Sequence, residues 1–322
     1  MAKAVDAHSK FKNLSQKRKG KTTMKTPKCL KCGNEIPNKN DRILVNHPTG
    51  DRYYCRHCVE ILHERLESSR TYSEENGKFQ SKPTAQGYTI SKEFEIPRTV
   101  QYMFGRDKLD MILANMDAKG WIPTHDCTVW AECKSPIYHG LQSYNKDIKT
   151  IAKLLEVERW SHDDSYGTHT NIGHTDFNES RMETIRKWRE TLITPLQNTI
   201  KNDRDGCIAI YGRYFTDYAD TMGGSPAHDH CCFINLQHSR WVEFRLNKFT
   251  SVEQDNRATK MSIEIFDNLL NFSRRVDANR AYLNGSALAD ANRKEAEKTA
   301  TKLVKVWEAY SAEARLANVT TA

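Results

Sequence analysis

The chain has 322 residues, enough for one large domain or two smaller ones with a substantial hydrophobic core. Apolar residues make up 38% and charged residues 28%, and no apolar run approaches the roughly 20 residues of a membrane-spanning helix or forms the core of a secretory signal. These features argue against a helical membrane protein. We therefore expect an intracellular, cytoplasmic protein with no membrane partner.

Residues 1–28 form a strongly basic segment. They contain nine Lys or Arg residues and one acidic residue, Asp6, so this segment carries the whole net charge of +8. From residue 29 onward the chain is balanced, with 40 basic and 40 acidic residues. We expect a disordered tail that makes a weak contact with nucleic acid or only improves solubility.

Two CxxC pairs follow the basic tail, Cys29 with Cys32 and Cys55 with Cys58. Each pair places two thiols on a tight turn, so the two pairs together can bind one tetrahedral Zn²⁺ ion. The sequence therefore predicts a small zinc ribbon over residues 29–66. Zinc ribbons bind nucleic acid, bind proteins or brace a neighbouring domain, and the spacing alone does not choose among these roles.

Residues 67–87 are polar, without apolar periodicity, and are expected to form a linker. Beyond them, strand-like and helix-like patterns alternate, which predicts an α+β fold with a mostly antiparallel sheet and flanking helices. The strands are expected at 88–96, 129–134, 168–172, 233–237 and 241–246. The helices are expected around 109–116, 148–155, 178–193, 263–270 and 296–316. We divide this part into a domain at 88–275 and a C-terminal helical segment at 276–322.

Polar residues recur at alternate positions in these strands, so the members of each pair point to the same face. The pairs are Glu93 with Glu95, Glu132 with Lys134, His169 with Asn171, and Glu243 with Arg245. Each pair alone has an ordinary explanation, such as a solvated acidic face, a structural histidine or a surface ion pair. Their combination is chemically suggestive because carboxylate oxygens suit Mg²⁺, and paired metals can bridge the phosphates of ATP.

The order of the motifs carries further information. The motifs are EFE at 93–95, the acids and SP dipeptide within 126–136, GTHTN at 167–171, YGR at 211–213, and IN with VEFR within 234–245. This set resembles the amidoligases, a family of glutamine synthetase-like carboxylate–amine ligases, over roughly residues 88–275. Two features depart from the family pattern: Asn171 stands where a second histidine is common, and Pro97 ends the first strand early.

The resemblance implies a glutamine synthetase-like catalytic domain with Mg²⁺ ligands at Glu93, Glu95, Glu132, His169 and Glu243. It implies catalytic roles for Glu243, Arg245 and His169. It also implies nucleotide or substrate contacts from Arg213, Asn171 and Asn235. A separate cluster, His228, His230, Cys231 and Cys232, suggests either a second zinc site or a loop at the substrate entrance.

The predicted activity is ATP-dependent formation of an amide or peptide bond through an acyl phosphate. ATP and Mg²⁺ would be the cofactors, Zn²⁺ would be structural, and the resemblance implies an amino acid, peptide or protein substrate. The main alternative is a nucleic-acid-binding or adaptor protein with a non-catalytic ligase-like domain. A third hypothesis is a degenerate ligase that retains nucleotide binding for regulation.

Overall fold

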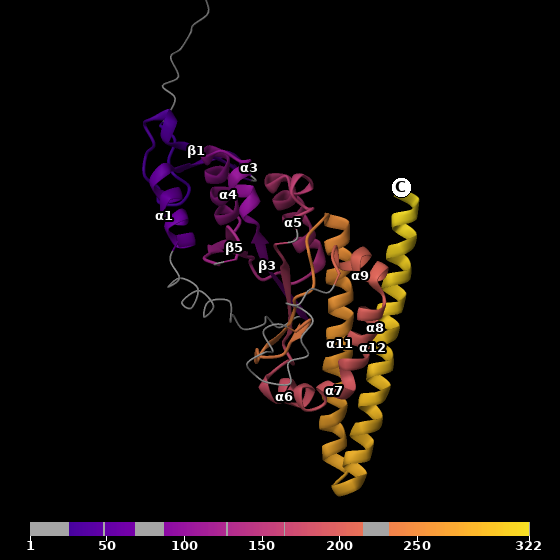
Figure 1. Ribbon diagram of the computed structural model, residues 1–322. Coiled ribbons are helices and arrows are strands. Elements are labelled where there is room, and N and C mark those ends of the chain that lie inside the picture. The colour runs from indigo at the N-terminus through magenta and orange to yellow at the C-terminus, as the bar shows by residue number, and fades with distance from the viewer. Residues whose placement is uncertain are drawn as a thin grey trace, which may run out of the picture.

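The computed structural model describes residues 26–47, 49–67, 87–126, 128–163, 165–214 and 232–321. The basic tail up to residue 25, the linker from 68 to 86 and the His228–Cys231 part of the histidine–cysteine cluster lie outside the described residues. Figure 1 shows the cysteine module at one end, a sheet in the middle and two long helices, α11 and α12, along the opposite side.

The cysteine module consists of a hairpin and one helix. Strands β1 (Arg42–His47) and β2 (Gly50–Cys55) pair antiparallel after a short 3₁₀ helix, η1 (Lys39–Asp41). Helix α1 (Arg56–Glu67) begins directly after β2. In β1 the side chains alternate between buried and exposed, as a half-buried strand requires.

A six-stranded sheet forms the centre of the molecule. Its strands are β3 (Tyr88–Ile96), β4 (Ile122–Thr124), β5 (Ala131–Lys134), β6 (Thr168–His174), β7 (Ile234–Asn235) and β8 (Trp241–Phe244). The spatial order is β4-β5-β3-β6-β8-β7, and every neighbouring pair is antiparallel. This confirms the predicted α+β fold with a mostly antiparallel sheet and flanking helices, and the strands expected at 233–237 and 241–246 pair with each other as β7 and β8.

The larger part of the chain also contains helices, several of which pack on other helices rather than on the sheet. They are α3 (Arg98–Met103), α4 (Arg106–Ala118), α5 (Leu141–Leu155), η2 (Val157–Arg159), α6 (Glu179–Lys187), α7 (Arg189–Leu192), α8 (Thr194–Asn202), α9 (Arg204–Tyr211), α11 (Val252–Tyr282) and α12 (Gly285–Thr321). Asn178 caps α6, since its side chain accepts a hydrogen bond from the Arg181 N–H at 3.1 Å.

One predicted helix and one predicted domain boundary differ from the structure. The helix expected over 178–193 is divided into α6 and α7, which meet at Trp188. Helix α11 runs without a break through residue 275, so the division that we placed between residues 275 and 276 falls inside one helix. Its apolar face packs against α12 over much of its length, and this contact makes the two helices a continuous part of the core (Figure 1).

The central strand β3 separates the two faces of the sheet. Ile90, Phe94 and Ile96 are buried on one face, while Glu93 and Glu95 point to the other. Phe94 packs edge-on against Trp121 and Trp160, with ring centroids 6.4 and 6.5 Å apart. The apolar face therefore supplies the hydrophobic core, and the opposite face is left for polar chemistry.

One ion pair lies inside the apolar core. Lys92 Nζ is 2.7 Å from Asp255 Oδ1, and both side chains are fully buried. Thr170 Oγ1 accepts a second hydrogen bond from Lys92 at 2.6 Å, while Asn247 and the Tyr144 hydroxyl donate to Asp255. Burial lowers the pKa of Lys92, and the Asp255 charge opposes that shift. The network joins β3 and β6 to the first turn of α11.

Replacing Asp255 with alanine should lower the free energy of unfolding by about 3–5 kcal/mol, because it leaves Lys92 as an unpaired buried cation. Urea unfolding measures this value. As a matched control, Arg293→Ala removes an exposed ion pair to Asp290 and should cost about 1 kcal/mol or less. The double variant Lys92→Met/Asp255→Leu should be more stable than Asp255→Ala. Equal free energies of unfolding for Asp255→Ala and the double variant would show that the unpaired Lys92 charge does not cause the loss of stability.

Candidate functional site

The four cysteines of the two CxxC pairs meet in one cluster. The Sγ atoms of Cys29, Cys32, Cys55 and Cys58 all lie within 4.8 Å of one another, and those of Cys32 and Cys55 are 3.8 Å apart. Gly33 has a φ of 78°, which lets the first turn close, and its N–H donates to the Cys29 carbonyl at 2.9 Å. Four thiols in this arrangement can bind a metal such as zinc.

Backbone hydrogen bonds favour the ionised, cation-binding form of one cysteine in this cluster. Burial opposes ionisation of Cys29, but N–H groups of Cys32, Cys55 and Lys31 outweigh it and lower its pKa to about 7. Burial instead raises the pKa of Cys58. One thiolate is thus available near neutral pH, and a bound metal ion would stabilise the others.

The cysteine module docks on helix α4. Asn115 Oδ1 accepts from the Asn46 N–H at 2.9 Å, and Asn115 Nδ2 donates to the Leu44 carbonyl at 3.1 Å. Asp117 accepts hydrogen bonds from Lys31 Nζ at 2.9 Å and from the Tyr54 hydroxyl at 2.8 Å. These contacts cover one side of the module, which favours a bracing role over a free binding surface.

Purified protein should contain about one zinc ion per chain, and Cys58→Ala should lose it together with part of the thermal stability. The expected loss is large because zinc contributes about 10–16 kcal/mol to comparable small modules. Elemental analysis and thermal unfolding measure both effects. Cys207→Ala is the control because Cys207 is buried outside the cluster. Zinc retained in Cys58→Ala, or lost equally in Cys207→Ala, would contradict the assignment.

The polar face of the six-stranded sheet gathers the other predicted residues. Strand pairing places Glu95 opposite Glu132, and Glu93 between Lys134 on β5 and His169 on β6. Two further pairings on this face join predicted residues, Asn171 with Glu243 and Asn235 with Glu243. Motifs far apart in the sequence therefore form one continuous site.

The first cluster on this face is Glu93, His169 and Glu243, whose ligand atoms lie within 4.8 Å of one another. His169 Nδ1 is 3.3 Å from Glu93 Oε2 and 3.0 Å from Glu243 Oε1. Asn171 Nδ2 donates to Glu93 at 3.2 Å, but the buried Asn171 Oδ1 has no hydrogen-bond partner among the described residues. Such an oxygen fits an additional cation ligand.

Electrostatics hold this cluster in its charged form. Burial alone would lower the pKa of His169. Hydrogen bonds with Glu243 and Glu93 have a larger, opposite effect, so the pKa is raised to about 10. Burial likewise opposes ionisation of Glu243, yet hydrogen bonds with His169 and His238 bring its pKa well below the usual value. In this form the protonated His169 occupies the space between two carboxylates, where a divalent cation would compete with its proton.

The second cluster is Glu95, Asp126 and Glu132, also within 4.8 Å. Burial and the nearby Glu93 charge raise the pKa of Glu132 to about 8, although Lys134 Nζ lies 3.5 Å from its Oε1. Three carboxylates this close together could hold a cation through their oxygens. His169 Nε2 lies 3.4 Å from Glu95 Oε1 and so links the two clusters.

The remaining predicted residues differ in their surroundings. Arg245 is buried at the site, with Nε 3.7 Å from Glu243 Oε1. Asn235 Nδ2 donates to Glu243 Oε2 at 2.6 Å, so it positions that carboxylate. Arg213 donates to the carbonyls of Leu246, Tyr166 and Arg245 at 3.0 to 3.1 Å. Its observed contacts therefore stabilise the loop backbone beside the site.

Three residues of this site, Asp126, Lys134 and His238, had no predicted role. Strand periodicity placed Lys134 on the face of Glu132 but gave it no role in the site. Asp126 lies in a loop, and His238 lies in the turn between β7 and β8, where no periodicity applies. His238 Nε2 is 3.2 Å from Glu243 Oε2, and its ring stacks on Trp241 at 4.5 Å.

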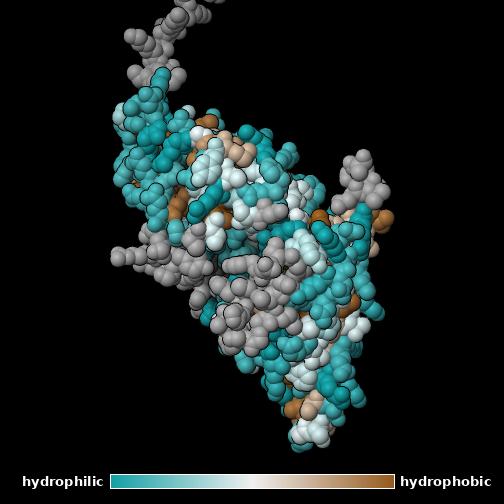
Figure 2. Space-filling view, viewed as in Figure 1, coloured by the Kyte–Doolittle hydropathy of each residue, from teal (hydrophilic) through white to brown (hydrophobic). Residues whose placement is uncertain are grey.

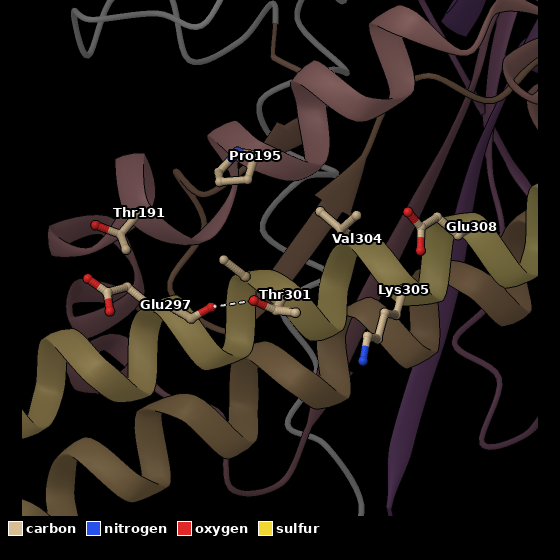
Figure 3. A pocket seen from close by; sticks show the side chains of 8 residues that line it. Thr191, Pro195, Glu297, Thr301, Val304, Lys305 and Glu308 are labelled. Carbon is tan, nitrogen blue, oxygen red and sulfur yellow. Dashed lines mark hydrogen bonds between the residues drawn. The ribbon is translucent and has the colours of Figure 1, made fainter.

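A separate groove of about 520 Å³ lies between α12 and the junction of α7 with α8 (Figure 3). It is lined by Thr191, Pro195, Glu297, Ala300, Thr301, Val304, Lys305 and Glu308. None of these residues belongs to the acidic clusters. On the face shown in Figure 2, the hydrophobic residues of the described chain are scattered among hydrophilic ones. We assign no role to this groove.

Comparisons of the chain with protein-family models, with curated proteins and with solved structures found no match. The amidoligase resemblance therefore depends on the motifs and their order. Within the described residues, no helix has both the length and the apolar character needed to cross a membrane.

Proposed function

We propose that this protein is an ATP-dependent carboxylate–amine ligase with a glutamine synthetase-like catalytic domain. The observation that supports this proposal best is the convergence of Glu93, Glu95, Glu132, His169 and Glu243 on one face of an antiparallel sheet. The order of their motifs is the order that the amidoligase resemblance implies. Amino acids, peptides or protein side chains are the proposed substrates.

The two clusters fit a pair of magnesium ions. Glu93 and Glu95 are two positions apart on β3, so their Cα atoms are about 6.6 to 6.8 Å apart, and each contributes to a different cluster. Asn171 Oδ1 supplies a further oxygen beside the first cluster. Bound Mg²⁺ would offset the negative charge of the ATP phosphates and align them for transfer.

The proposed reaction has two steps. A substrate carboxylate oxygen attacks the γ-phosphorus of ATP, the bond to the β–γ bridging oxygen breaks, and ADP leaves. An amine then attacks the acyl carbon, inorganic phosphate leaves, and the amine loses a proton to water.

Arg245 and Lys134 are buried cations beside the carboxylates, and they would stabilise negative charge on the transferred phosphoryl group. Asn235 and His238 would hold Glu243 in place.

The docking of the cysteine module weighs against the nucleic-acid-binding alternative. Lys31 and the edge of β1 contact α4, so these groups of the module already have partners within the protein. If the basic tail nevertheless grips nucleic acid, binding should fall steeply with salt and disappear when residues 1–28 are deleted.

Titration calorimetry should detect ATP binding that requires Mg²⁺ in the wild type and is lost in Glu95→Gln. The substitution keeps the size of the side chain but removes one charged ligand of the second cluster. Glu158→Gln changes an exposed glutamate and should bind as the wild type does. Equal binding by Glu95→Gln, or binding that does not depend on Mg²⁺, would contradict the proposed site.

Glu243→Gln should reduce amide formation, followed as phosphate release with a screened carboxylate and amine, by about 100- to 1000-fold. This corresponds to the roughly 2.7–4 kcal/mol lost when one preorganised charge-stabilising contact is removed. Circular dichroism checks that the variant is folded. An unchanged rate in the folded variant would remove Glu243 from the mechanism.

A further inference from the structure

Helix α1 connects the four-cysteine cluster to the second acidic cluster. It begins directly after Cys55, contains Cys58 in its first turn and ends at Glu67. Its 12 residues span about 18 Å. Leu62 and Leu66 are buried in the main hydrophobic core, together with residues of the sheet. The position of α1 is thus fixed by the cysteines at one end and by the core at the other.

The last turn of α1 makes one polar contact that reaches the site. His125 Nδ1 lies 2.6 Å from the carbonyl oxygen of Leu66, so the ring donates its Nδ1–H to that carbonyl. The last four carbonyls of a helix have no partner within the helix, and they carry its negative dipole end. His125 therefore satisfies an acceptor that the helix itself leaves open.

His125 directly precedes Asp126, the loop member of the second cluster. The flanking strands end at Thr124 and begin again at Ala131, so sheet hydrogen bonds do not fix the Asp126 backbone. Within the described part of this loop, Thr128 donates to Asp126 Oδ1. That local turn shapes the loop, while the contact between His125 and Leu66 anchors it to another element.

We propose that helix α1 of the cysteine module positions Asp126 for cation binding, with His125 as the positioning residue. Zinc binding by the cysteines then sets the affinity of a second metal site about one helix length away. This inference depends on the proposed function, because it takes Glu95, Asp126 and Glu132 as ligands. Independent support for a cation on this face comes from the buried, unpartnered Asn171 Oδ1 among the described residues, in the cluster that His169 links to Glu95.

Mn²⁺ binding to the zinc-loaded full chain, followed by electron paramagnetic resonance, tests the proposal. The wild type should bind two Mn²⁺ ions, and Asp126→Asn should weaken one of them. His125→Ala should weaken the same ion about 10- to 100-fold, as loss of an outer-shell contact typically does, with zinc content unchanged. His125→Gln, whose amide can donate to Leu66, should recover part of the affinity.

His63→Ala is the matched control. His63 also lies on α1 and contacts a carboxylate, Asp110 Oδ1, at 2.8 Å, but it does not touch the Asp126 loop. It should leave Mn²⁺ binding unchanged. Equal weakening by His63→Ala and His125→Ala would overturn the specific route through His125, since general loosening of the module would explain both.

The remaining outcomes separate this inference from the proposed function. Mn²⁺ binding that is weakened by Asp126→Asn but not by His125→Ala would overturn the inference and leave the ligase proposal standing. A wild type that binds no Mn²⁺ would overturn both. Cys32→Ser, which should lose zinc, is expected to weaken the same Mn²⁺ ion. Full Mn²⁺ affinity in that zinc-free variant would overturn the link to the cysteine cluster.

Discussion

In the centre of the sheet, Glu95 lies directly opposite Glu132, and like charges at that spacing repel each other. The fold accommodates this arrangement by placing cations around it: Lys134 beside Glu132 and a protonated His169 near Glu95. Burial and the nearby Glu93 charge, with a smaller contribution from Glu95, raise the pKa of Glu132 to about 8. A sheet face that retains carboxylates at this cost is well suited to binding cations.

The same strand also stabilises the fold through its other face. Lys92 lies between Phe94 and Ile90 in the pattern of β3 and pairs with Asp255 at the start of α11. Both partners are fully buried, and the pair joins the centre of the sheet to the first turn of α11. The core face of the sheet thus ties the strands that carry the acidic residues to α11.

Sequence periodicity and spacing predicted the features that depend on residues close together in the chain. The alternation in β3 and the following Pro97 defined that strand with its observed bounds, and the CxxC spacing identified the cysteine cluster. Asp126 and His238 were missed because loop and turn residues reach the site only through tertiary structure. The docking of Asn115 against β1 is likewise a long-range contact, and no spacing along the chain encodes it.

In the proposed function, the acidic face binds nucleotide through metal ions. Crystals grown with Mn²⁺ and a non-hydrolysable ATP analogue would test it most directly, because anomalous scattering locates manganese independently of the protein model. We predict manganese peaks at Glu93–His169–Glu243 and at Glu95–Asp126–Glu132, with the triphosphate between them and Arg245. Nucleotide bound elsewhere, or an acidic face without manganese at saturating concentration, would contradict this account.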